Sequence, residues 1–167
     1  NTYSFFALYA NIDGFTYKEA DIEMAKRPEI DRWILSELNT LTDYCDKSYS
    51  EYEPTKAGRA IADFVDGYLS NWYVRLCRRR FWKGEYTCDK ISAYQTLYTC
   101  LETIARLAAP IAPFFCERLF DDLNSVSGRF AFGSVHAADF PQSNPALVDK
   151  ELENRMQTEI GRASCRE

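Results

Sequence analysis

The sequence predicts an all-α fold, an antiparallel helical bundle of four or five helices joined by short links. Apolar residues recur at helical spacing along most of the chain, and alternating strand patterns are almost absent. Proline and glycine residues also stand at the boundaries between the periodic stretches. With 167 residues, the chain is long enough for one domain with a substantial core.

The N-terminal third contains two predicted helices separated by a loop. Residues 2–10 form the end of an apolar helix, and residues 11–27 form the loop, with Asp13-Gly14 as a turn signal. Pro28 suits a first helical turn, and apolar residues at helical spacing indicate that the second helix continues to about Tyr49.

The middle of the chain predicts two long helices. The first begins at Pro54 and ends at Gly84, which suits the position after a helix. Its apolar stripe consists of Ala57, Ile61, Phe64, Val65, Tyr68, Trp72 and Leu76. Thr87 is a suitable N-cap for the next helix, which continues to Ala108.

The C-terminal third is less regular. Pro110 and Pro113 end one helix and begin a shorter one that reaches Leu123. We expect residues 124–145 to be irregular, with a short extended piece at residues 134–136. A last helix should start near Ala146.

Composition limits the possible functions. The net charge of −5 argues against nucleic-acid binding through bulk charge, so any such contact needs a local basic patch. No apolar run approaches the ~18 residues that span a bilayer, and no secretory pattern is present. The cysteines lack the C-x-x-C spacing of a zinc site and favour buried, reduced thiols in a cytosolic protein: Cys45, Cys77, Cys88, Cys100, Cys116 and Cys165.

The most informative stretch is NWYVRLCRRRFWK, residues 71–83. It contains five basic residues and no acidic one, and four aromatic residues lie among them. Arginine side chains bind phosphates, and aromatic or guanidinium planes stack on unpaired bases. These residue types make the stretch a candidate for RNA contact.

Helical geometry supports this interpretation. At about 100° per residue, Arg79 and Lys83 fall within about 20° of the direction of Trp72. A face that is apolar early in the helix therefore becomes basic at its end. Unpaired charges are rarely buried, so we expect this helix end to leave the core or to meet a charged partner.

A solvated helix end is the alternative interpretation of the same residues. Cations near a helix C-terminus are favoured by the macrodipole. They can also pair with nearby acidic residues such as Asp63, Asp66 or Glu85.

Other features are weaker. Asp121-Asp122 lacks a partner base and suits the surface near a helix end. Residues 125–133 hold two glycines without the spacing of a phosphate loop. His136 should pack or hydrogen-bond locally. We expect the core to include Tyr94, Tyr98 and Phe115.

Several blocks of the sequence resemble class I aminoacyl-tRNA synthetases, and most closely the isoleucyl-tRNA synthetase family as found in the Bacteroidetes. The blocks occur in the family's order over residues 1–158. They are NTYSFFALYANIDGF (1–15), RPEIDRWILSELN (27–39), YEPTKAGRAIADFVDGYLSNWYVRLCRRRFWKGE (52–85), YQTLYTCLETIARLAAPIAPFFCERLF (94–120) and SVHAADFP (134–141).

The resemblance implies a role in a longer cytoplasmic enzyme that attaches isoleucine to its tRNA with ATP and Mg²⁺. The catalytic domain, with HIGH-like and KMSKS-like signatures, and the editing domain that removes valine would lie upstream. Neither signature occurs here, so we expect no ligase activity, no catalytic or metal site and no cofactor in this piece. The family's helical domain binds the anticodon arm of the tRNA, and the partners implied are the isoleucine tRNA and the missing domains of the same monomeric chain. In this light, RNA contact within residues 71–83 is predicted for Arg75, Arg78, Arg79, Trp82 and Lys83.

The family pattern also divides the chain. Residues 1–10 would end a helix from the catalytic domain, and residues 11–158 would be the anticodon-binding domain, truncated at its C-terminus. Residues 159–167, EIGRASCRE, resemble a translated sequencing adapter, and the helical periodicity stops at Gly161. Asn1 is not an initiating residue, so we expect an internal piece of a longer protein.

Two alternatives remain. In the first, the chain comes from a sister class I enzyme such as the valyl synthetase, although the ANIDGF and RRRFW blocks favour the isoleucyl family. A helical protein-interaction module without RNA binding is the second. Salt dependence distinguishes it, because phosphate contacts weaken steeply as salt rises.

Overall fold

The computed structural model describes residues 1–82 and 85–164, and in these residues it contains helices and no strands. The α-helices are α1 (Thr2–Asp13), α2 (Glu29–Ser50), α3 (Pro54–Asp63), α4 (Arg75–Trp82), α5 (Cys88–Ala108), α6 (Pro113–Ser127) and α7 (Lys150–Ser164). The predicted all-α bundle is confirmed. No helix among the described residues is long and apolar enough to cross a membrane.

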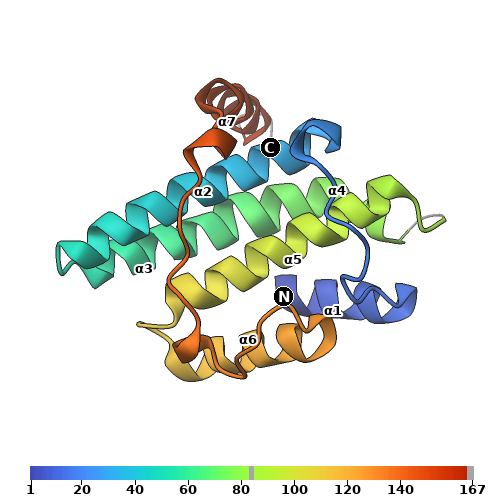
Figure 1. Ribbon diagram of the computed structural model, residues 1–167. Helices are drawn as coiled ribbons and strands as arrows, with labels where there is room; N and C mark the ends of the chain where they lie inside the picture. The colour runs from blue at the N-terminus through green and yellow to red at the C-terminus, as the bar shows by residue number, and fades with distance from the viewer. Residues whose placement is uncertain (83–84, 165–167) are drawn as a thin grey trace.

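Helix α5 forms the centre of the bundle (Figure 1). It contacts α2, α3 and α4 on one side and α1 and α6 on the other. Helix α7 lies against α2 at the edge of the bundle. Because neighbours cover α5 on both sides, most of its side chains are buried.

The predicted boundary residues act as expected at several helix ends. Pro54 and Pro113 occupy the first turns of α3 and α6, and the Thr87 side chain accepts a hydrogen bond from the Lys90 backbone N–H. Gly14 follows α1 at φ 70°, a left-handed conformation that glycine adopts without steric cost. These signals are local, so the sequence reveals them.

The core is rich in aromatic residues. The ring of the fully buried Tyr94 stacks on Phe15 with centroids 4.9 Å apart and meets Phe81 edge-on at 5.1 Å. Phe6 adds an edge contact to the same ring at 6.2 Å. This cluster joins α1, α4 and α5, and such pairs add to the stabilisation from burial.

Several local predictions were wrong. Residues 11–13 belong to α1 rather than to the loop, and α6 reaches Ser127 rather than ending at Leu123. Residues 134–136 are not extended, because a 3-10 helix spans Val135–Ala137. The last α-helix begins at Lys150 rather than near Ala146, where only a 3-10 turn forms, and it passes Gly161 to end at Ser164. Phe115 is 65% exposed rather than in the core, whereas Tyr94 and Tyr98 are buried as predicted.

The cysteine prediction is largely confirmed for the described residues. Cys45, Cys77, Cys100 and Cys116 are buried free thiols, and Cys88 is exposed. Cys165 lies outside the described residues. Among the residues that the structure describes, no group of three or more potential metal ligands is clustered.

Candidate nucleic-acid interface

The helix predicted over residues 54–84 is interrupted by a π-helical segment, Phe64–Val74. A π-helix has more residues per turn than an α-helix, so a wheel drawn at α-helical spacing loses its phase across it. Tyr73 faces the core from the end of the π segment, and Cys77 and Phe81 face the core beyond it. Leu76 is 53% exposed, although the wheel placed it in the apolar stripe.

This shift corrects the predicted geometry of the basic face. Arg79 does not continue the buried face, because that face now passes through Cys77 and Phe81. Lys83, which the wheel placed on the same line, lies outside the described residues, as does the predicted helix end at Gly84.

The remaining predicted residues nevertheless share one face of α4. Arg75, Arg78, Arg79 and Trp82 have the spacing i, i+3, i+4 and i+7, which brings side chains together on an α-helix. All four are exposed, and Trp82 is 54% exposed. We call these four residues the basic face; it presents three guanidinium groups beside one indole ring.

Arg80 points away from the basic face and into the bundle. Its guanidinium donates hydrogen bonds to both carboxylate oxygens of the fully buried Asp31, at 2.6 Å and 2.9 Å. It also pairs with Asp89 at 2.9 Å. Burial lowers the pKa of Arg80, but hydrogen bonding and the charge of Asp31 raise it overall, so the side chain stays charged.

The rest of the Asp31 site is also polar. The Tyr73 hydroxyl donates to Asp31 at 2.8 Å, and the Ser92 hydroxyl donates at 2.6 Å. Burial raises the pKa of Tyr73 well above its ordinary value, so the hydroxyl keeps its proton. Pairing with acidic residues thus explains Arg80, although its partners are Asp31 and Asp89 and not the acids expected from the sequence.

Helix α1 borders the basic face. The Arg78 Cζ atom lies 6.0 Å from the centroid of the Phe5 ring, within cation–π range. Phe5 packs edge-on against Phe81 of α4 at 5.3 Å and against Tyr9 at 4.9 Å. Leu8 and Ile12 are exposed on the outer side of α1. Basic and aromatic side chains of α4 and α1 therefore meet at this border.

The end of α1 is fixed to α5 by polar contacts. The Tyr94 hydroxyl donates to Asp13, and the nearly buried Lys90 ammonium lies 2.6 Å from the same carboxylate. These contacts hold the C-terminal end of α1 against α5.

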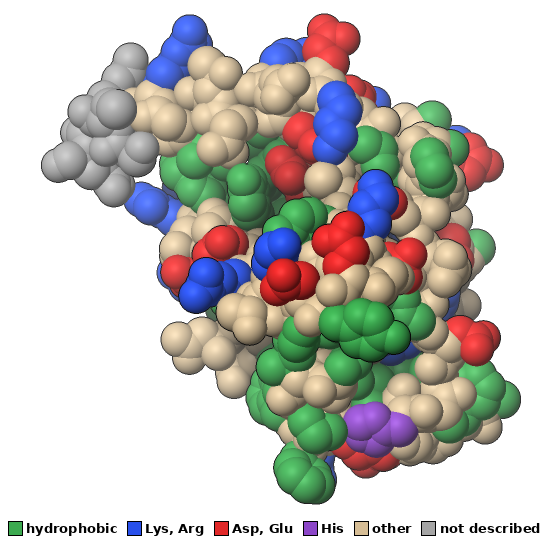
Figure 2. Space-filling model, turned by 90° about the vertical axis from the view of Figure 1, so that its left-hand side faces the viewer, with side chains coloured by type: hydrophobic (Ala, Val, Ile, Leu, Met, Phe, Trp, Pro, Cys, Tyr) green, Lys and Arg blue, Asp and Glu red, His purple; other side chains and the backbone are tan. Residues whose placement is uncertain are grey.

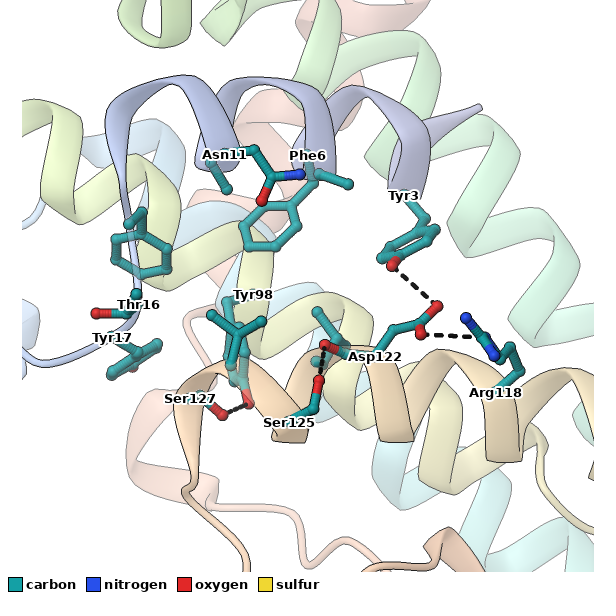
Figure 3. Close-up of a pocket in the computed structure, with 15 residues that line it drawn as sticks. Tyr3, Phe6, Asn11, Thr16, Tyr17, Tyr98, Arg118, Asp122, Ser125 and Ser127 are labelled. Atoms are coloured by element: carbon teal, nitrogen blue, oxygen red, sulfur yellow. Dashed lines mark hydrogen bonds and ion pairs between the residues drawn. The ribbon is translucent and has the colours of Figure 1, made fainter.

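A pocket of about 360 Å³ opens on the other side of α1, against α6 (Figure 3). The Phe6 ring and the Asn11 amide point into it from α1. On its α6 side, Asp122 accepts a hydrogen bond from Tyr3 at 3.1 Å and forms an ion pair with Arg118 at 3.0 Å. These contacts tie α1 to α6 through Asp122.

The opposite end of the bundle differs from the basic face. Figure 2 shows basic and acidic side chains mixed there with hydrophobic ones. His136 is half exposed, and its Nε2 atom lies 3.9 Å from Glu117. Its backbone N–H donates a hydrogen bond to the Ser134 hydroxyl at 3.2 Å, which is the local contact that the sequence predicted. From the last turn of α6, the Asn124 amide donates to the Phe130 and Phe132 carbonyls, so these contacts hold the two-glycine segment that follows the helix.

Comparison with known proteins identifies related sequences. Residues 31–163 match the family model described as the anticodon-binding domain of tRNA ligase. The chain is 67% identical over 157 residues to the isoleucine–tRNA ligase of Bacteroides thetaiotaomicron, covering 94% of this chain and 14% of that protein. The corresponding Cytophaga hutchinsonii protein is 66% identical over 93% of this chain and 14% of its own length. The Thermus thermophilus protein is 45% identical over 93% of this chain and 15% of its own length.

Proposed function

Because this chain belongs to the family of anticodon-binding domains of tRNA ligases, we propose that it binds the anticodon arm of a tRNA. We further propose that it acts within an isoleucine–tRNA ligase, since the compared relatives carry that name. The cytoplasm is the proposed location of this enzyme. The chain spans about one seventh of their length, at 14% to 15%. Isoleucine activation, with the ATP and Mg²⁺ it requires, would belong to the rest of such a protein.

The proposed division of the chain follows from this role. Residues 1–10 would connect to a catalytic domain, residues 11–158 would form the RNA-binding bundle, and residues 159–167 would be foreign to it. Helix α7 continues through Gly161 to Ser164. This continuation is compatible with a foreign origin of residues 159–167, since a foreign sequence can also be helical.

The observation that carries the proposal is the exposed basic face of α4. Its arginines can each donate two parallel hydrogen bonds to a phosphate, which gives Arg an advantage over Lys at such sites. Trp82 offers an exposed ring on which an unpaired base can stack, a contact worth about 1–3 kcal/mol. Because the net charge of the chain is −5, its electrostatic attraction for RNA must come from a local basic patch of this kind.

Each residue of the face has a distinct part in this proposal. Arg78 is supported by the Phe5 ring, so its guanidinium is held in place before RNA arrives. Arg75 and Arg79 lie on either side of it along the helix and would contact neighbouring phosphates. Lys83 follows the same spacing in the sequence and would extend the phosphate contacts.

The direct test is RNA binding measured across salt concentrations. A hairpin RNA with the anticodon-arm sequence of an isoleucine tRNA would be titrated with the full chain by fluorescence anisotropy. Changing Arg75, Arg78 and Arg79 together to Ala should weaken binding and reduce the salt slope by about two to three, because each phosphate contact contributes about 0.7–0.9. A matched control changes Arg32, Lys56 and Arg59, three exposed cations elsewhere, to Ala. Equal losses in both variants, with circular dichroism showing intact helices, would refute the proposed interface.

A further inference from the structure

The pocket between α1 and α6 combines an apolar wall with an unsatisfied polar edge. The wall is formed by Phe6, Phe15 and Val126, and Val126 is half exposed at the pocket mouth. The Asn11 side chain projects from α1 toward this space, is exposed, and makes no hydrogen bond within the described part of the chain. The amide therefore keeps one donor group and one acceptor oxygen available to a ligand.

The charges at the pocket mouth cancel each other. Arg118 and Asp122 lie opposite Asn11, and their side chains pair with each other at 3.0 Å. The Tyr3 hydroxyl also donates a hydrogen bond to Asp122. A phosphate would meet the Asp122 carboxylate here without a free cation to offset it. A neutral group with an apolar face and polar edges fits the site better than an anion does.

The position of the pocket relates it to the basic face. Consecutive residues of α1 point to the two sites, because Phe5 supports Arg78 while Phe6 lines the pocket. An α-helix with its side chains is about 10–12 Å across, so one helix separates the two sites. Leu8 and Ile12 are exposed on α1, which gives its outer surface an apolar character. An RNA loop lying along α1 can therefore reach both sites.

We propose that this pocket receives one unpaired nucleobase of the bound RNA loop, with its face against the Phe6 side and its polar edge on the Asn11 amide. Unpaired bases are recognised in this way, by aromatic contact and by hydrogen bonds to their edges. An Asn amide matches a base edge that presents a donor beside an acceptor. The inference rests on the proposed RNA-binding function and adds to it a site that reads a base rather than the backbone.

The test fills the pocket and removes its polar group separately. Ala7 lines the pocket from α1, and Ala7→Phe would occupy the space that a base needs. Asn11→Ala removes the amide and leaves the space. The matched controls are Ser4→Phe and Ser4→Ala on the exposed side of the same helix. Each variant is titrated with the hairpin RNA and with hairpins in which one loop base at a time is replaced by an abasic site.

The proposal predicts a specific pattern of affinities. Asn11→Ala and Ala7→Phe should each weaken binding about tenfold, with the salt slope unchanged and the Ser4 controls like the original chain. One abasic hairpin should bind the original chain more weakly than the intact hairpin does. With the Ala7→Phe chain, the same abasic hairpin should bind almost as well as the intact hairpin, since both changes remove the same contact. That non-additivity would identify the base that enters the pocket.

Other outcomes overturn the inference in distinguishable ways. Salt-dependent binding that is the same in the Ala7, Asn11 and Ser4 variants would reject the pocket and leave the proposed function intact. Absence of salt-dependent binding in the original folded chain would reject the proposed function and, with it, the base site. Free nucleosides are tested separately. If nucleosides bind in the pocket but no abasic loop position shows non-additivity with Ala7→Phe, the assignment of the pocket to RNA is overturned.

Discussion

Arg80 and Asp31 form a two-point ion pair inside the bundle, although 49 residues separate them in the sequence. The Asp31 carboxylate is fully buried and accepts two further hydrogen bonds, from Tyr73 and Ser92. This pair fixes the rotation of α4 about its own axis, because Arg80 must face inward. The basic face is consequently held toward solvent, so a core contact determines which arginines can meet a ligand.

Breaking this pair should be costly. Arg80→Met removes the cation and leaves Asp31 buried without a compensating charge, which typically costs about 3–5 kcal/mol. Urea unfolding followed by circular dichroism measures the loss. Lys26→Ala, which breaks the exposed Lys26–Glu23 pair, should change stability little because surface ion pairs contribute weakly. Similar midpoints for the two variants would show that Arg80 does not anchor α4.

Features that depend on neighbouring residues could be predicted from the sequence, and features that depend on distant residues could not. Pro54, Thr87 and Pro113 begin or cap helices through contacts with their immediate neighbours, so local signals located those boundaries. The π segment could not be predicted in this way, because nothing in the spacing of its apolar residues distinguishes it from an α-helix. Its consequence was the misplacement of Leu76.

The candidate site shows the same division. Arg75, Arg78, Arg79 and Trp82 lie on one face because their spacing within α4 is independent of the π segment before it. The pairing of Arg80 with Asp31 depends on a contact between α2 and α4 that no local pattern contains. The pocket at Asn11 depends on α6 packing beside α1, and a single asparagine gives no signal of it in the sequence.

Glu37 should make the chain less stable as the pH rises. Burial, and next the charge of Glu153, raises the pKa of Glu37 from 4.5 to about 7, while hydrogen bonding from Trp33 and the charge of Lys150 oppose the change. The folded state therefore binds this proton more tightly than the unfolded state. Its stabilising contribution is complete below pH 4.5 and is lost as the pH rises through about 7.

Glu37→Gln tests this dependence because the amide remains uncharged. The variant should lose less stability than the original chain between pH 5 and pH 8, measured by urea unfolding at several pH values. Glu51→Gln, at an exposed position, is the control and should leave the pH profile unchanged. Parallel profiles for Glu37→Gln and the original chain would contradict a raised pKa at Glu37.

Glu153 should hold α7 onto α2. Its carboxylate accepts hydrogen bonds from Ser36 at 2.6 Å and Thr40 at 2.8 Å, and Lys150 pairs with it at 2.7 Å. Glu153→Ala leaves the buried Ser36 hydroxyl without this acceptor and should cost about 2 kcal/mol. Hydrogen exchange should accelerate in α7 and remain unchanged in α5. Glu151→Ala, which alters an exposed neighbour, should preserve the protection of α7; equal exchange in both variants would exclude the anchoring role.

Thiol reactivity should separate Cys88 from the buried cysteines. Burial raises the pKa of Cys45, Cys77 and Cys116 to about 11, and it raises that of Cys100 further. The thiolate is the reactive form, so these four side chains lack both access and charge at pH 8. In a Cys165→Ser chain, a disulfide reagent should modify one thiol rapidly and the other four only at the rate of unfolding. Adding Cys88→Ser should abolish the rapid phase, and a rapid phase that persists would show that one of the four thiols is accessible in the folded bundle.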